Sequence, residues 1–188
     1  MGARQNGRMR LEIDERLHLR PVEAGDADSI YALVDADRAR LAAWMPWAAE
    51  QTLAGTREFV AESRAQQERG DGFQAAVVRD GEIAGVAGYH RIDQVNRSTS
   101  IGYWLASRHE GQGVMTAAVR ALVGYAFGTW GLNRVAIEAA VANRRSRAIP
   151  ERLGFREEGV LRESELVGGR FLDGVLYSLL ASEWEARP

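Results

Sequence analysis

The sequence contains no cysteine and no lysine, and all 24 of its basic residues are arginines. Without a thiol there is no cysteine nucleophile, no disulfide, no CxxC redox pair and no zinc site with cysteine ligands. Without a lysine there is no Schiff base to pyridoxal phosphate and no P-loop lysine for the phosphates of ATP. We attribute the exclusive use of arginine to genome composition rather than to function.

Histidine is also scarce, with only His18, His90 and His109 in the chain. No two of them are four residues apart, so the sequence predicts no histidine-rich metal site. No apolar run approaches about 18 residues and the N-terminal segment has no signal-peptide core, which predicts no membrane contact and a cytoplasmic location. The net charge of −2 gives no positive field, so no nucleic-acid partner is expected.

The composition is that of one ordinary globular domain, with 188 residues of which 46% are hydrophobic and 27% charged. Residues 1–12 are polar, basic and without periodicity, and we expect them to form a flexible N-terminal tail. Residues 13–188 show no repeat and no linker, so we expect them to form a single domain.

Local patterns predict an alternation of strands and helices. Asp26 and Thr52 are suitable N-caps for the first two helices, and Asp80–Gly81 is a typical hairpin turn. The expected helices are 26–44, 52–69, 113–127 and 143–153, and the expected strands are 17–21, 73–78, 83–91, 100–105, 134–141, 155–166 and 170–180. A run of hairpins followed by strand–helix–strand units is typical of an α+β, or mixed α/β, domain.

The segment 103–116 carries a Gly-x-Gly loop between an expected strand and a long apolar helix. Gly111 and Gly113 let the backbone turn tightly and approach a ligand. The first amides of the helix have no intrahelical partner, and with the helix dipole they form a site for an anion such as a pyrophosphate. Thr116 stands where a dinucleotide-binding loop has its third glycine. The alternative is that both glycines only shape a turn.

The run 108–113, RHEGQG, matches the R/Q-x-x-G-x-G/A signature of the GNAT superfamily of acetyl-CoA-dependent N-acetyltransferases. Residues 15–184 as a whole resemble the RimJ/RimL-type branch, which acetylates the N-terminal amines of ribosomal proteins. The similarity includes the patch 44–47 (WMPW) and, most specifically, the segment 143–155 (NRRSRAIPERLGF). The resemblance implies a GNAT fold, which is a central, mostly antiparallel sheet with one splayed pair of parallel strands, flanked by about four helices.

The resemblance also implies acetyl-CoA as the cofactor, bound in a V-shaped gap between the strands 100–106 and 134–141. The backbone of Trp104 and Leu105 would pair with the pantetheine arm like an extra strand, and Asn143 would hydrogen-bond that arm. Arg108 would add charge near the pyrophosphate. The amides that would bind the pyrophosphate are those of Gly111, Gln112, Gly113, Val114, Met115 and Thr116. The alternatives are a solvated Arg108 and an Asn143 that only caps its helix.

The catalytic assignments rest on the same resemblance. In many GNAT enzymes a tyrosine seven residues after the asparagine protonates the leaving thiolate, but here that residue is Pro150, which cannot hydrogen-bond the carbonyl of Ser146. In the ribosomal-protein branch a serine has this role, and it corresponds to Ser146, with an ordinary surface serine as the alternative. The same branch implies that Glu165 deprotonates the amine, with Glu138 and His90 as rivals.

Trp44, Trp47 and His90 are the expected substrate-binding residues. Two tryptophans this close together around a proline could wall a substrate cleft, although burial in the core is the default for tryptophan. His90 ends a strand that should line the same cleft. Tyr177 and Asp173 also match family positions, and we expect structural roles for them.

These features predict an N-acetyltransferase that passes acetyl directly from acetyl-CoA to a primary amine in a ternary complex. The expected acceptor is the N-terminal α-amine of a protein such as a ribosomal protein. Two alternatives stay open: a small-molecule N-acetyltransferase for a polyamine, amino acid or aminoglycoside, and a non-catalytic acyl-CoA-binding module. Carboxylates in the acceptor cleft would favour the small molecule, and an open groove would favour a peptide. A homodimer would be unsurprising.

Overall fold

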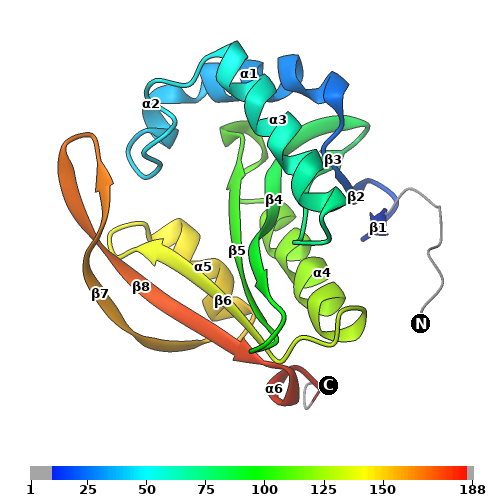
Figure 1. The fold of residues 1–188 in the computed structure, drawn as a ribbon. Coiled ribbons are helices and arrows are strands. Elements are labelled where there is room, and N and C mark those ends of the chain that lie inside the picture. The colour runs from blue at the N-terminus through cyan, green and yellow to red at the C-terminus, as the bar shows by residue number, and fades with distance from the viewer. Residues whose placement is uncertain (1–9, 186–188) are drawn as a thin grey trace.

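The central element of the fold is one mixed sheet. The computed structural model describes residues 10–185 and places eight strands in them, in the order β1-β2-β3-β4-β5-β6-β8-β7 (Figure 1). All neighbouring strands are antiparallel except β5 and β6, which run parallel. The strands are β1 (Leu11–Glu12), β2 (Leu17–Pro21), β3 (Gln74–Arg79), β4 (Glu82–Asp93), β5 (Ser98–Leu105), β6 (Arg134–Ala140), β7 (Arg156–Val167) and β8 (Arg170–Leu180).

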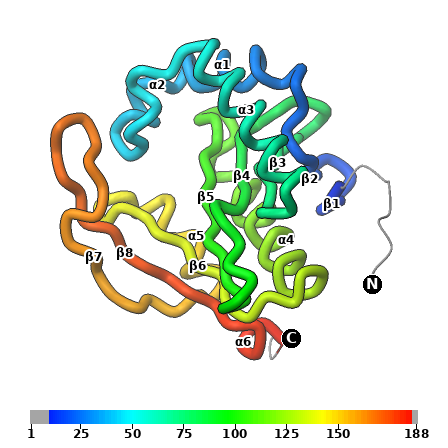
Figure 2. Tube along the Cα trace, viewed as in Figure 1, coloured from blue at the N-terminus to red at the C-terminus, as the bar shows by residue number. Residues whose placement is uncertain are grey.

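Helices cover both faces of the sheet (Figures 1 and 2). The described part of the chain has the α-helices α1 (Ala27–Ala36), α2 (Arg38–Leu41), α3 (Leu53–Glu68), α4 (Val114–Gly128), α5 (Arg144–Arg152) and α6 (Ala181–Glu185), and the 3-10 turns η1 (Ala24–Asp26) and η2 (Ser107–His109). The expected mixed α/β class, with a mostly antiparallel sheet and one parallel pair, is confirmed.

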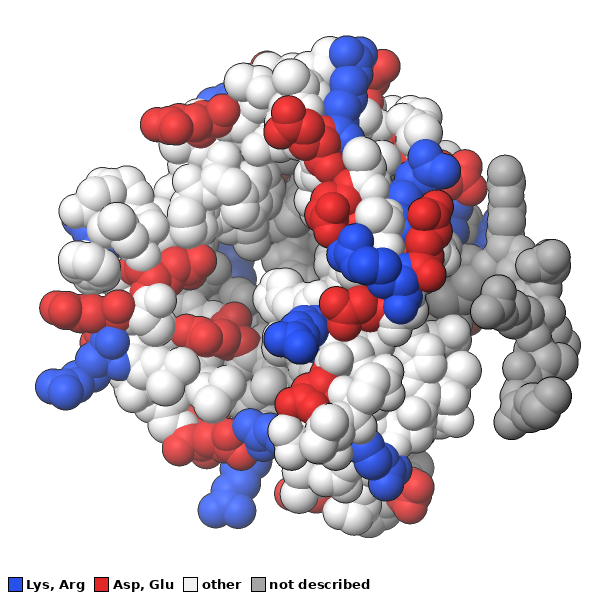
Figure 3. All heavy atoms as spheres, viewed as in Figure 1, with Lys and Arg blue, Asp and Glu red and all other residues white. Residues whose placement is uncertain are grey.

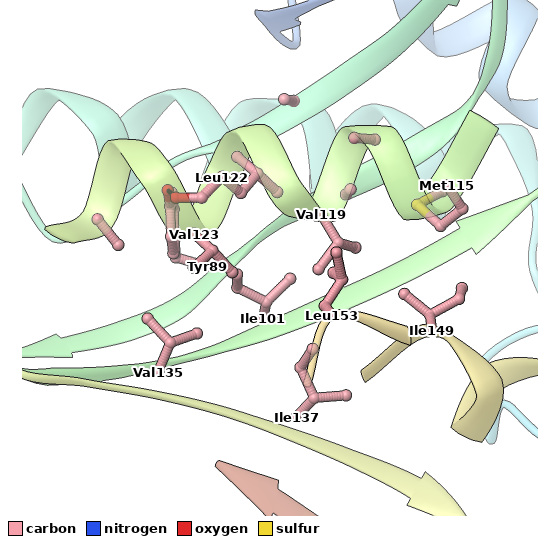
Figure 4. Packing of buried hydrophobic residues seen from close by; sticks show 14 of the residues in the cluster. Tyr89, Ile101, Met115, Val119, Leu122, Val123, Val135, Ile137, Ile149 and Leu153 are labelled. Atoms are coloured by element: carbon pink, nitrogen blue, oxygen red, sulfur yellow. Dashed lines mark hydrogen bonds between the residues drawn. The ribbon is translucent and has the colours of Figure 1, made fainter. Parts of the chain in front are cut away.

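The alternation of side chains along the strands separates two cores. In β3, Ala75 and Val77 belong to the core beneath α4, while Ala76 and Val78 belong to the core beneath α1 and α3. Figure 4 shows the first core, where apolar side chains of α4 point toward the strands and Leu153, the C-cap of α5, lies beside Val119. The sheet is therefore held between two helical layers, and the site lies at its middle strands.

Local sequence signals set several element boundaries. The Thr52 hydroxyl accepts a hydrogen bond from the Gly55 amide at 3.0 Å and caps α3. Asp80 and Gly81 both have positive φ, at 52° and 83°, as the two-residue turn of the β3–β4 hairpin requires. These predictions are confirmed because each depends on neighbours in the sequence.

Two expectations about the N-terminal part are wrong. Leu11 and Glu12 belong not to a tail but to β1, which pairs with β2; residues 1–9 lie outside the described residues. The expected helix 26–44 divides at Asp37 into α1 and α2. The Asp37 carboxylate accepts hydrogen bonds from the Ser107 amide at 2.6 Å and the Ser107 hydroxyl at 2.7 Å, so a tertiary contact accompanies the break.

Asp26 also differs from its predicted role. Its side chain does not cap α1. Instead the carboxylate accepts hydrogen bonds from the Glu23 amide at 2.7 Å and from the Arg20 guanidinium at 2.7 and 2.8 Å. Asp26 therefore anchors the turn η1 to β2, and it does not cap the N-terminus of α1.

The parallel pair opens after three residues. Residues 98–100 of β5 pair with residues 134–136 of β6, and the ladder ends there although β5 continues to Leu105 and β6 to Ala140. Beyond this point β5 stays paired with β4, and β6 with β8. The two strands diverge visibly in Figure 1. The splayed pair is therefore confirmed, and it leaves a gap in the middle of the sheet.

Candidate active site

Two clefts meet where β5 and β6 separate. The larger has a volume of about 1110 Å³ and reaches the start of α4. The smaller has a volume of about 600 Å³ and lies between the segment after α2 and the strands β6 and β7, where the surface in Figure 3 is hollowed. The residues that line both clefts are Trp44, Met45, Tyr103, Trp104, Asn143 and Ser146.

The larger cleft contains the glycine loop. Gly111 and Gly113 have φ of 72° and 75°, a left-handed conformation that other residues rarely adopt. Gly113 is the N-cap of α4, which continues for 15 residues. Of the predicted cofactor residues, this cleft is lined by Trp104, Leu105, Gly111, Gly113, Val114, Met115, Thr116 and Asn143. The first amides of a long helix thus border the cleft, as pyrophosphate binding requires.

Arg108 and the Gln112 side chain lie outside the lining of this cleft. The Arg108 guanidinium contacts Glu82 at 3.4 Å and donates to His109 Nε2 at 3.0 Å. The Gln112 side-chain amide donates to the Arg108 carbonyl at 2.9 Å. The prediction that Arg108 adds charge at the pyrophosphate site is therefore not supported by its position, because its side chain turns toward β4.

Other arginines, which the sequence analysis missed, bring positive charge to the larger cleft. They are Arg40, Arg120, Arg145 and Arg152. Arg145 and Arg152 are seven residues apart on α5, a spacing that puts both on one face of a helix. In the sequence, only that spacing indicates that Arg145 and Arg152 act together. The tertiary structure shows that their shared face of α5 borders the larger cleft.

Glu110, beside the first loop glycine, joins α2, the loop and α5. Its carboxylate accepts hydrogen bonds from Arg40 at 2.7 Å and from Arg145. Arg40 also donates to the Leu105 carbonyl and to Asp37, each at 2.7 Å. These contacts hold α2 against the end of β5 and the glycine loop. Arg40 Nε is a buried donor without a hydrogen-bond partner among the described residues, so the cleft wall retains an unused donor.

Asn143 and Ser146 lie at the start of α5, beside the junction of the clefts. Asn143 Oδ1 accepts a hydrogen bond from the Ser146 amide at 3.1 Å, so Asn143 caps the helix as well as lining the cleft. Ser146 Oγ donates to the Tyr103 hydroxyl at 3.3 Å. Tyr103 was also missed, because the alternating pattern of its strand does not reveal which side chain meets α5.

Trp44 and Trp47 line the smaller cleft and do not lie in the core. Trp47 is 39% exposed, and its ring centroid is 6.3 Å from that of Trp104. His90 lines the same cleft, with Nδ1 3.0 Å from Ser100 Oγ. Desolvation lowers the pKa of His90, so its imidazole is uncharged near neutral pH.

Two carboxylates, Glu138 on β6 and Glu165 on β7, line the smaller cleft. Glu138 accepts a hydrogen bond from the Ser164 hydroxyl at 2.7 Å. Desolvation raises the pKa of Glu165, and the nearby charge of Glu138 raises it further. A carboxyl group with a raised pKa suits proton transfer at neutral pH.

The structure gives Tyr177 and Asp173 contacts that support the fold. The Tyr177 hydroxyl accepts from Arg147 Nε at 2.8 Å and donates to Glu151 at 3.0 Å, which ties β8 to α5. Asp173 accepts a hydrogen bond from the Glu163 amide at 2.8 Å and fixes the β7–β8 hairpin. Neither residue lines the larger or the smaller cleft.

The two clefts differ in charge. Four arginines and two carboxylates, Glu12 and Glu110, line the larger one. The described residues that line the smaller one include Glu138 and Glu165 but no arginine. The larger cleft therefore fits a ligand with several phosphate charges, and the smaller one fits an amine.

The described residues give no support for a metal centre or a membrane span. They contain no group of three or more His, Cys, Asp or Glu side chains that could hold a metal ion. Within the same range, no helix combines the length and the apolar character that crossing a membrane requires.

Comparison with known proteins decides the family. Residues 16–156 match the acetyltransferase (GNAT) domain. The chain belongs to the GNAT acetyltransferase family. This acetyltransferase is 43% identical over 176 residues to the putative ribosomal N-acetyltransferase YdaF of Bacillus subtilis (strain 168), covering 93% of this chain and 96% of that one. It is 28% identical over 169 residues to the ribosomal-protein-serine acetyltransferase of Escherichia coli (strain K12), covering 89% and 94%.

A solved relative also identifies the cofactor. RimL, a ribosomal L7/L12 α-N-protein acetyltransferase solved in complex with coenzyme A, has a TM-score of 0.89 to this acetyltransferase at 25% identity, covering 93% of this chain and 99% of that one. The chain is thus an acetyl-CoA-dependent N-acetyltransferase. The expectation of an enzyme is confirmed over that of a non-catalytic module.

Proposed function

We propose that this acetyltransferase acts on the N-terminal α-amine of a protein, such as a ribosomal protein, and transfers acetyl directly in a ternary complex. One observation carries the proposal: a cationic cleft and an anionic cleft meet at Tyr103, Trp104 and Ser146. Acetyl-CoA in the first cleft and an amine in the second could place the thioester carbonyl and the nitrogen side by side. The names of the relatives support a ribosomal-protein acceptor.

In the proposed reaction the amine nitrogen attacks the thioester carbonyl, so that a C–N bond forms and the C–S bond breaks. A backbone amide of β5 beyond Ser100 stabilises the oxyanion. The Ser146 hydroxyl turns its hydrogen from Tyr103 to the sulfur and gives that proton to the leaving thiolate, and Glu165 takes a proton from the nitrogen through water. The proton on Glu165 then passes through water to Ser146, which restores the Glu165 carboxylate and the Ser146 hydroxyl. No acetyl-enzyme intermediate is required, in keeping with a chain that has no cysteine and no lysine.

Glu165 is the proposed base because its environment suits an α-amine. A free α-amine titrates near ~8, so a modest base is sufficient. Partial desolvation and the charge of Glu138 both raise the pKa of Glu165 above the ordinary value of a glutamate. We assign His90 to acceptor binding with Trp44 and Trp47, because all three line the smaller cleft and His90 Nδ1 is engaged with Ser100 Oγ.

A small-molecule amine with a second positive charge is the other candidate acceptor. The observation that favours it is the pair Glu138 and Glu165 in one cleft, since an α-amine alone needs a single carboxylate. The partly exposed Trp47 at the same cleft favours a larger, protein acceptor that continues outside the cleft.

A turnover screen separates these candidates. We expect coenzyme A release from acetyl-CoA with peptides that begin with Ser, Ala or Thr, and no release with the same peptides already blocked at the N-terminus. Faster turnover of polyamines or aminoglycosides would establish the small-molecule alternative. A protein that binds no acetyl-CoA in calorimetry would contradict the proposed function altogether.

A ribosomal-protein acceptor would require a cytoplasmic location, which we include in the proposal. We also include a homodimer, because the edge strand β7 and its hairpin expose the apolar side chains of Val160, Leu161, Leu166 and Phe171. Sedimentation velocity tests this expectation, and a monomer at tens of micromolar would contradict it.

A further inference from the structure

Tyr103 makes two contacts that the proposed chemistry does not use. Its hydroxyl donates a hydrogen bond to the Ser146 carbonyl at 3.0 Å. The same oxygen accepts a hydrogen bond from Ser146 Oγ at 3.3 Å. One side chain of β5 therefore holds both the main chain and the side chain of the residue that we propose as the acid, at the junction of the two clefts.

The contact between the Tyr103 hydroxyl and the Ser146 carbonyl is explained by the residue four positions further along α5. In an α-helix the carbonyl of residue 146 accepts its hydrogen bond from the amide of residue 150. That residue is Pro150, which lies inside the helix and has no amide hydrogen. A carbonyl left without a donor in a protein interior destabilises the fold. The Tyr103 hydroxyl supplies a donor in place of the missing amide.

We propose that Tyr103 is a positioning residue for acetyl transfer: it replaces the amide donor lost at Pro150 and thereby fixes the Ser146 hydroxyl where the clefts meet. This inference rests on the proposed role of Ser146. Because Tyr103 stands on β5, next to Trp104, it also keeps the first turn of α5 at a fixed distance from the strand that borders the larger cleft.

Burial keeps the Tyr103 hydroxyl in the form that can donate to the Ser146 carbonyl. Desolvation raises the pKa of Tyr103 to about 12. The hydroxyl therefore stays protonated through the reaction, which suits a fixed hydrogen-bond partner.

A cycle of four proteins tests the inference: wild type, Tyr103→Phe, Pro150→Ala and the double variant. Tyr103→Phe should lower Tm by about 2–6 °C, because the Ser146 carbonyl loses its donor. It should also lower kcat about tenfold, with the KM for acetyl-CoA changed less than about twofold. Tyr125→Phe is the control, because it makes the same chemical change on α4 outside both clefts.

The double variant distinguishes positioning from stability. Pro150→Ala restores an amide donor, so in that background Tyr103→Phe should lower Tm by less than half as much. The loss of kcat should persist, because the restored amide does not hold the Ser146 hydroxyl. Equal losses of Tm in both backgrounds would overturn the pairing with Pro150, and recovery of kcat in the double variant would overturn the positioning role.

The outcomes also separate this inference from the proposed function. A wild-type protein that acetylates none of the amines in the peptide and polyamine screen would overturn the proposed function, and the positioning role would be lost with it. An active wild type with an unchanged kcat in Tyr103→Phe would overturn the positioning role alone.

Discussion

Ser146 is the residue on which the proposed chemistry depends most. Ser146→Ala removes the proposed proton donor while leaving the larger cleft intact, so kcat should fall about 10–100-fold. The Kd for acetyl-CoA in calorimetry should change less than about threefold, because the arginines and loop amides remain. Ser29→Ala, on the exposed face of α1, is the matched control. A weakened Kd with an unchanged kcat would remove Ser146 from catalysis.

The pH dependence of the reaction depends on the carboxylate pair. Activity should fall with decreasing pH as Glu165 is protonated, and its raised pKa puts this loss at a higher pH than for an ordinary glutamate. Glu138→Gln removes the neighbouring negative charge, so the Glu165 pKa should decrease and the acid limb of kcat/KM should move to lower pH. Part of the shift should remain, because desolvation is its larger cause.

Glu157→Gln is the control for this experiment, since Glu157 lies on the same strand as Glu165 but outside the smaller cleft. Its acid limb should coincide with that of the wild type. An unmoved acid limb in Glu138→Gln would mean that Glu165 is not the group that titrates.

At the residue scale the sequence predicted the site unevenly. Ser146 and Glu165 were predicted from a family resemblance and the two tryptophans from their closeness around a proline, and the fold places all four in the lining of the smaller cleft. Arg40 and Tyr103 could not be found in this way. Their partners, Glu110 and Ser146, are 70 and 43 residues away in the sequence, so no local pattern indicates these contacts.

At the scale of elements, the turn from the glycine loop into α4 sets where the first amides of α4 lie in the larger cleft. Gly113→Ala places a β-carbon at a φ of 75°, which should lower the free energy of unfolding by about 1–2 kcal/mol. The same strain should move the first amides of α4 and weaken coenzyme A binding about tenfold. Calorimetry and denaturant unfolding measure the two effects.

Gly128→Ala is the control, because Gly128 lies at the other end of α4, with open space around its missing β-carbon. This change should be neutral or stabilise by about 0.4–1 kcal/mol. Coenzyme A binding as tight in Gly113→Ala as in Gly128→Ala would show that the loop conformation is not needed for the ligand.

Elements that depend on neighbouring residues were predicted, and elements that depend on distant residues were not. The cap at Thr52 and the Asp80–Gly81 turn depend on adjacent residues, and both are in place. The division between α1 and α2 depends on Ser107, 70 residues after Asp37, and β1 depends on pairing with β2. Neither could be predicted from local periodicity, because the partner that stabilises each feature lies elsewhere in the chain.

For the whole molecule, acid stability depends on an ion pair that joins three strands. Arg134 of β6 donates to both oxygens of Glu158 on β7, at 2.7 and 2.6 Å, and the Ser178 hydroxyl of β8 donates to Glu158 at 2.7 Å. These hydrogen bonds lower the pKa of Glu158 to about 2. Since the folded pKa lies below the ordinary value, this stabilisation is complete above about pH 4.5 and is lost as the pH falls toward 2.

Glu158→Gln should therefore lower the free energy of unfolding at pH 7 by about 1 kcal/mol, a value reduced for the partial exposure of the pair. The difference from wild type should shrink as the pH is lowered to 2. Glu62→Gln, in a fully surface pair with Arg69, should have almost no effect at either pH. A constant difference between pH 7 and pH 2 would contradict the assigned cause.

At the scale of the whole chain, the proposed reaction without a covalent intermediate rests on how the sheet brings two clefts together. One mixed sheet opens between β5 and β6, and the opening joins a cationic cleft to an anionic one. The loop and the acidic strands are far apart in sequence and meet only in the folded molecule. This geometry supports the proposed direct transfer between two bound substrates.

Initial-rate kinetics with both substrates varied is the most direct test of that claim. With acetyl-CoA and a peptide that begins with Ser, direct transfer predicts double-reciprocal lines that intersect, and no acetylated protein in mass spectra of enzyme incubated with acetyl-CoA alone. Parallel lines together with an internal acetyl adduct would show a covalent route and contradict direct transfer.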